Sequence, residues 1–152
     1  MIGKNMLFRI YTITLLLTLS LYGQKLKVPK NIDLQTKDDY KRTEKFLLQC
    51  IDLVEKKPIN EKDDDVRLAM RFELKWIIGC PYITINVTSL MNKIVEVNSI
   101  FSIIYLGRWT KSATMNSYKL SDIDGNYAGY KVYWNITKRI KKLTGMSYWM
   151  NY

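Results

Sequence analysis

The chain contains no histidine, the side chain that most often serves as a general base or as the partner of a catalytic serine. Its serines and glycines form no GxSxG elbow, no P-loop and no dinucleotide-binding fingerprint. Two cysteines without a histidine cannot complete a tetrahedral zinc site, so the sequence predicts no metal and no cofactor. Carboxylates are the remaining candidates for catalysis.

Cysteine is scarce, and the two that are present, Cys50 and Cys80, leave two alternatives open. In an oxidising compartment they can form a disulfide, which would close a loop of about 30 residues and add roughly 3 kcal/mol of stability. They can equally be buried free thiols, because cysteine is among the most frequently buried residue types.

Negative charge is also scarce, since 14 acidic residues stand against 24 lysines and arginines, a net charge of +10. Cationic exported proteins tend to meet anionic surfaces such as phospholipid headgroups, lipopolysaccharide, acidic glycans or nucleic acid. The sequence carries no specific nucleic-acid motif. We therefore expect an anionic envelope polymer, lipid headgroups or a protein as the partner, although solubility alone would also explain the charge.

The chain has one long apolar run, and it lies near the N-terminus. Lys4 and Arg9 precede the uncharged stretch 10–19, and a short polar segment with the small residue Gly23 follows it. This order is typical of a secretory signal peptide. The run is shorter than the roughly 20 apolar residues that span a bilayer. The sequence thus predicts a signal peptide over 1–23, export to the periplasm or the exterior, and a mature chain of net charge +8.

Apolar residues recur at three- and four-residue spacing through most of the remaining chain, which predicts an all-α bundle of about five helices. The expected helices cover 37–57, 60–78 with Asn60 as N-cap, 89–97, 99–115 with Ser99 as N-cap, and 126–143. Residues 82–88 alternate like a strand but have no partner strand, so we expect an extended connector there. Residues 116–125 read as a loop because of their serine, aspartate and glycine content.

The domain organisation follows from these elements. We expect a flexible N-terminal arm over 24–36, a single helical domain over 37–145 and an aromatic C-terminal tail over 146–152. The domain is large enough to bury its own core and is expected to be a monomer.

Glu73 is the one carboxylate that falls on an apolar helical face, between Ala69 and Trp76 on one side and Val66 and Ile77 on the other. Burial would raise its pKa, as a general acid requires, so Glu73 is the candidate acid of a small hydrolase. The alternative is a glutamate at the core margin, satisfied by a tyrosine or a lysine. A glycosidase would need a second acid, and the sequence does not place Asp122 or Asp124 opposite.

The last predicted helix has two distinct faces. Its core face is expected to hold Val132, Tyr133, Ile136, Ile140 and Leu143. The other face gathers aromatic and cationic side chains, with Lys131 beside them: Tyr127, Tyr130, Trp134, Lys138 and Lys141. Aromatic rings can stack on sugars or bases and lysines neutralise phosphate or carboxylate, so this face is the candidate site for an anionic polymer. Alternatively, the aromatic tail covers the rings and the lysines are simply solvated.

Two short segments resemble a group of small exported bacterial proteins. Phe72–Pro81 (FELKWIIGCP) is similar to their KWxxGxP segment and Leu106–Lys111 (LGRWTK) to their GGWTK-like segment, with a further likeness at 58–61. The resemblance covers about 70 residues and implies a helical fold and a bacterial origin, but no function, because the group has no assigned activity. This chain departs from it at Glu73, where the group has an aliphatic residue, which argues against a group-wide catalyst.

The same segments place one tryptophan on each of two core helices, Trp76 and Trp109. We expect both indoles either to fill the core, with the neighbouring cations reaching outward, or to line a shared pocket with Arg108 at its mouth. Taken together, the sequence predicts an exported, non-enzymatic helical domain with a binding or accessory role in the cell envelope. A carboxylate-dependent hydrolase and a cationic membrane-active effector are the alternatives.

Overall fold

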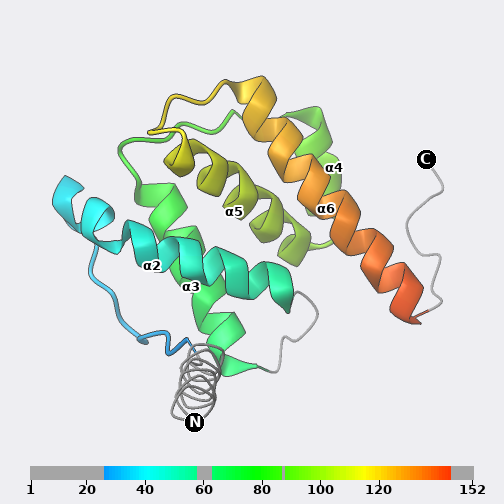
Figure 1. Cartoon of the computed structure of the whole chain (residues 1–152), viewed down its shortest axis with the longest axis horizontal. Helices are drawn as coiled ribbons and strands as arrows, with labels where there is room; N and C mark the ends of the chain where they lie inside the picture. Colours follow the sequence, from blue (N-terminus) through cyan, green and yellow to red (C-terminus); the bar gives the residue numbers. More distant parts are fainter. Residues whose placement is uncertain (1–25, 58–62, 87, 145–152) are drawn as a thin grey trace, which may run out of the picture.

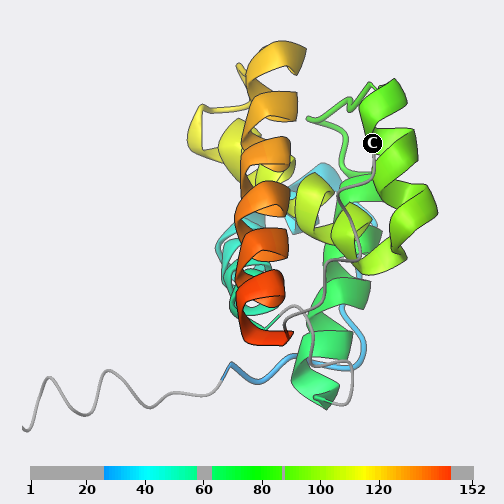
Figure 2. The ribbon, with the colours of Figure 1, turned by 90° about the vertical axis from the view of Figure 1, so that its right-hand side faces the viewer.

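The computed structural model of the chain describes residues 26–57, 63–86 and 88–144, and it contains five α-helices and no strand within them. The all-α prediction is therefore confirmed. Helix α5 is central, because it packs against α2, α3, α4 and α6, while α2 also packs on α3. Figure 1 shows α5 and α6 side by side, and Figure 2 shows α6 along one side of the molecule. The predicted signal peptide and aromatic tail lie outside the described residues.

Helix α2, Lys37–Lys56, begins at the predicted residue because a capping box starts it. The Asp39 amide donates to Thr36 Oγ1 at 3.3 Å, and the Thr36 amide donates to Asp39 Oδ2 at 2.8 Å. The helix buries one stripe against the core, made of Tyr40, Leu47, Cys50, Ile51 and Val54.

Helix α3, Asp64–Gly79, ends within one residue of the predicted end but begins later than predicted. Its N-cap is Asp63, whose side chain accepts the Asp65 amide at 3.1 Å. The expected cap, Asn60, lies outside the described residues.

Helices α4, Ser89–Val97, and α5, Ser99–Met115, have the predicted bounds. The cap of α5 is Asn98, not Ser99 as predicted, because the Asn98 side chain accepts the Ile100 amide at 2.8 Å. Helix α5 buries residues on both sides, for example Ile104 and Thr110, as a central helix must.

The segments outside the helices are irregular but packed. Residues 82–86 and 88 form no strand, which agrees with the predicted connector. In the part of the predicted arm that the structure describes, residues 26–36, Val28 is buried and the Ile32 carbonyl accepts a hydrogen bond from Lys75 Nζ at 2.8 Å. This segment therefore lies against α3.

Helix α6, Asp122–Thr144, begins four residues before the predicted start, so the loop prediction for 122–125 was wrong. Ser121 caps the helix: its hydroxyl accepts the Asp124 amide at 3.1 Å and donates to Asp124 Oδ2 at 2.7 Å. The sequence pattern indicates a turn at Gly125, but this residue lies near the start of α6 and has a packing role.

Glycines let α6 approach α5 closely. A Cβ atom on Gly125 would lie 2.1 Å from Trp109 Nε1, and one on Gly129 would lie 2.9 Å from the Tyr105 ring and from its carbonyl oxygen. The Tyr105 hydroxyl also donates to Asn126 Oδ1 at 2.7 Å. These contacts fix the rotation of α6 about its axis, and with it the residues that α6 turns to solvent.

Candidate functional site

Glu73 lies at the junction of α2, α3 and α5, with 0% of its surface exposed. Gly107 of α5 makes room for it, because a Cβ atom there would lie 2.0 Å from Glu73 Oε1 and 3.4 Å from Ile51 Cγ1. Neither carboxyl oxygen has a hydrogen-bond partner within the described part of the chain. The predicted apolar environment is confirmed, whereas the alternative of a carboxylate satisfied by a tyrosine or lysine is wrong.

Burial raises the pKa of Glu73 well above its ordinary value, and the nearby Glu55 carboxylate raises it further. Burial therefore favours the protonated form of this side chain. Its complete burial also separates it from solvent and from any substrate. Asp122 and Asp124, the possible second acids, are exposed on α6, so neither shares a cleft with Glu73. A general acid must reach the bond that it protonates, so this geometry gives the hydrolase alternative no support.

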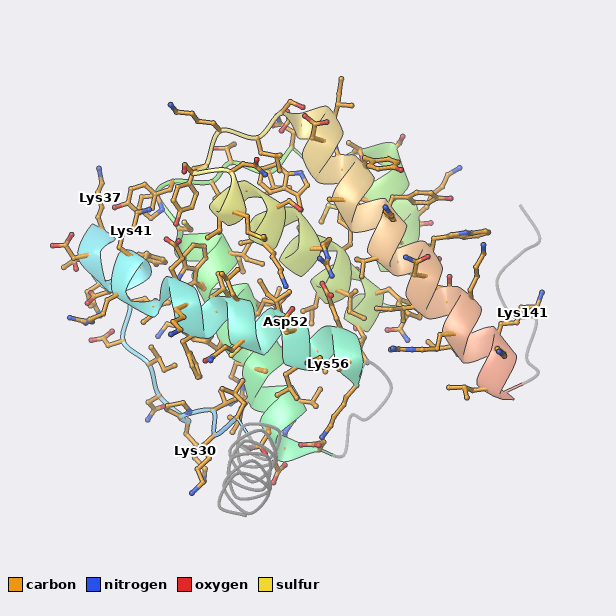
Figure 3. All side chains as sticks on the ribbon, viewed as in Figure 1. Lys30, Lys37, Lys41, Asp52, Lys56 and Lys141 are labelled. Carbon is orange, nitrogen blue, oxygen red and sulfur yellow. The ribbon has the colours of Figure 1, made fainter. Side chains whose placement is uncertain are left out.

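Two ion pairs join α5 to α2 beside this junction. The Arg108 guanidinium pairs with Glu55, and the Lys111 ammonium pairs with Asp52, which Figure 3 labels on α2. Arg108 is therefore held by a carboxylate of α2 and does not stand at the mouth of a pocket between the tryptophans.

The structure places the two core tryptophans at different junctions. Trp76 packs edge-on against Tyr40, with ring centroids 5.6 Å apart, and its Nε1 donates to Thr43 Oγ1 at 3.1 Å. Trp109 lies against Gly125 of α6. Both indoles are buried and fill the core, which is the first of the two interpretations, and they do not line a shared pocket.

Cys50 and Cys80 are both free and buried, which matches the second alternative for the cysteines and not the disulfide. Cys50 lies in the middle of α2, and Cys80 directly follows the last residue of α3. Burial, with a contribution from Glu73, raises the pKa of Cys50 to about 12.

The face of α6 that points away from α5 carries the predicted aromatic and cationic residues. Gly125, Gly129 and Ile136 are buried on the opposite side. Tyr127 is 65% exposed, and Lys138 and Lys141 are exposed. Figure 3 shows Lys141 extending from the far end of α6. We call the residues on this side the outer face of α6: Ile123, Tyr127, Tyr130, Trp134, Lys138 and Lys141.

Three members of the outer face form a stack along the helix axis. The Tyr130 and Trp134 rings are nearly parallel, with an interplanar angle of 18° and centroids 6.5 Å apart. Lys138 Nζ lies 4.8 Å from the Trp134 ring centroid, within cation–π range. The sequence predicted that these side chains share a face, and in the structure they form a continuous row along the helix.

Sequence reasoning missed Ile123, which is 81% exposed one turn before Tyr127. Its four-residue spacing from Tyr127 is the signal that points to it, but the composition of residues 116–125 predicts a loop there. The prediction that Leu143 faces the core was wrong, because this side chain is 73% exposed. Leu143 has the helical phase of the core residues, but it lies in the last turn of α6, where the helix extends past the bundle (Figure 1).

Other possible sites are weaker. A groove of about 510 Å³ lies between residues 29–33 and α3, and a second of about 500 Å³ lies between α3 and the start of α5. None of the site residues predicted from the sequence lines either groove. In the part of the chain that the structure describes, no three acidic or cysteine side chains gather closely enough to hold a metal ion. No described helix is long and apolar enough to cross a membrane.

Comparison with protein-family models, with curated proteins and with solved structures finds no match to this chain. The function must therefore be argued from the chain's own residues.

Proposed function

We propose that the protein is exported and acts, without catalysis, by binding an anionic component of the cell envelope through the outer face of α6. The observation that carries this proposal is the row of Tyr130, Trp134 and Lys138 on the side of α6 opposite the core, in which Tyr130 and Lys138 are exposed and Trp134 is half-buried. Large aromatic side chains left at the surface in a group commonly mark a binding site.

The charge of this helix supports an anionic partner. Lys131, Lys138, Lys141 and Lys142 are all exposed, and none of them forms an ion pair within the described residues. The two acids of the first turn, Asp122 and Asp124, are hydrogen-bonded to Asn86 and Ser121 and lie at the opposite end of α6 from Lys138 and Lys141. The end of the outer face that carries these lysines therefore presents positive charge with which no carboxylate of the described residues pairs.

Export is the second part of the proposal and rests on the signal-peptide pattern in residues 1–23. An exported protein of high positive charge would meet the anionic polymers and lipids of the envelope directly.

Removing two lysines from the outer face should weaken binding without affecting the fold. We expect Lys138→Ala with Lys141→Ala to lower the affinity for heparin, or for vesicles containing phosphatidylglycerol, by at least about tenfold, because each cation near such a surface contributes about 1 kcal/mol. The affinity should also depend less steeply on salt. Equilibrium binding at several salt concentrations measures both effects.

The matched control is Lys37→Ala with Lys56→Ala, which removes the same charge from the two ends of α2 (Figure 3). This variant should bind nearly as well as the wild type. If both double variants lose affinity equally, net charge and not the outer face of α6 governs binding, and the proposed function is wrong.

A further inference from the structure

The outer face of α6 changes character along its length, and this division bears on the partner in the proposed function, on which the inference rests. Its first three turns carry Ile123, Tyr127, Tyr130 and Trp134, which follow one another at intervals of four, three and four residues. This spacing keeps apolar side chains on one side of a helix. The next two turns carry Lys138 and Lys141 at the same positions.

The apolar half is turned to solvent. Ile123 is 81% exposed, and Tyr127 and Tyr130 are also exposed. Their side of α6 is opposite Gly125 and Gly129, which contact α5. None of these side chains belongs to the buried core, although Trp134 is half-buried, and none adds a charge that a hydrophilic polyanion would recognise.

The stacked rings distinguish between partners. The Tyr130 and Trp134 rings are nearly parallel with centroids 6.5 Å apart, and Lys138 Nζ lies over the Trp134 ring, 4.8 Å from its centroid. One face of the indole is therefore occupied by a lysine of the protein itself. A sugar or a base that stacked on this face would first have to displace Lys138, whereas an apolar medium needs no free ring face.

We infer that the partner of the outer face is the surface of an anionic lipid bilayer, on which α6 lies flat. The apolar side chains 123, 127, 130 and 134 enter the boundary between headgroups and acyl chains, where tyrosine and tryptophan are favoured. Lys138 and Lys141 on the same face, and the exposed Lys131 and Lys142 beside it, contact lipid phosphates. An exposed apolar row flanked by unpaired lysines matches both parts of such a surface, and a soluble polyanion matches only the lysines.

The test compares vesicles of phosphatidylcholine with and without phosphatidylglycerol, using the full chain and sedimentation as the readout. Ile123→Ser should reduce binding to the anionic vesicles about tenfold, since it removes an apolar side chain that enters the boundary. Ile78→Ser is the matched control, because Ile78 is 83% exposed but lies on α3, and it should leave binding unchanged. Binding to heparin should be the same for wild type and Ile123→Ser, because a polyanion does not use this side chain.

Each outcome decides the inference. Binding to anionic vesicles that falls in Ile123→Ser and in the outer-face lysine variant, but not in Ile78→Ser, supports it. Lysine-dependent binding to heparin combined with vesicle binding that Ile123→Ser does not change overturns it and leaves the proposed function standing. Loss of lysine dependence for both probes overturns the inference and the proposed function together.

Discussion

Glu73→Met is expected to stabilise the protein by about 1–3 kcal/mol at pH 7, the usual cost of a buried polar group that has no hydrogen-bond partner. The reason is that the wild-type carboxyl is completely buried and neither oxygen has a hydrogen-bond partner among the described residues. Methionine occupies a similar volume without a polar group that must lose its hydration. Chemical denaturation of both proteins measures the difference.

The gain should grow with pH. Burial raises the folded-state pKa of Glu73 above its ordinary value of 4.5, so the folded protein holds this proton more tightly than the unfolded chain does. The stability associated with this group is therefore fully present below pH 4.5 and is lost as the pH rises toward the folded-state pKa, by up to about 1.4 kcal/mol per unit. Glu55 and Cys50, which also influence the site, remain in both proteins, so the difference between the two curves isolates Glu73.

Glu73→Gln provides the control, because its amide has the same shape and stays neutral at every pH. It should remove the pH dependence that comes from this residue without the full gain of the methionine variant, since its polar atoms remain without partners. A methionine variant less stable than the wild type at pH 7 would show that the carboxyl has a stabilising partner.

Gly125→Ala is expected to destabilise the protein by about 3 kcal/mol, although alanine favours a helix by about 1 kcal/mol over glycine. The added Cβ atom would lie 2.1 Å from Trp109 Nε1 and 2.3 Å from Cε2 of the same indole. The indole is rigid and buried, so α6 must move away from α5. Thermal or chemical denaturation measures the loss.

The same substitution in a Trp109→Ala background gives the control, because the atoms that clash are then absent. There Gly125→Ala should be neutral or stabilising, and the two substitutions should be strongly coupled. Equal losses in both backgrounds would contradict the close contact between α5 and α6.

Most of the fold could be predicted from the sequence because the helices carry regular apolar stripes and strong local signals. Thr36 with Asp39 starts α2, and Gly79 with Pro81 ends α3. The start of α6 was missed because Gly125 is a turn signal in isolation, and only its contact with Trp109, distant in sequence, shows why a helix keeps it. The predicted burial of Leu143 was wrong because residue spacing gives the side of α6 on which a side chain lies, but not whether a neighbouring helix extends far enough to cover it.

The candidate site was predicted in part. Spacing alone brought Tyr130, Trp134 and Lys138 onto one face, and the apolar positions around Glu73 correctly indicated its burial. Spacing could not show that Arg108 pairs with Glu55 on another helix, nor that Trp76 and Trp109 lie at different junctions. Such contacts depend on how the helices pack, which a single sequence does not specify.

Trp134→Ala tests most directly whether the outer face of α6 is a binding surface, because it separates binding from stability. The predicted result is an affinity for phosphatidylglycerol vesicles about tenfold lower, with the free energy of unfolding lowered by no more than about 1 kcal/mol, because the half-buried indole lies outside the buried core. Lower thermal stability with unchanged affinity would contradict the account, because it would show that the indole serves packing and not a partner.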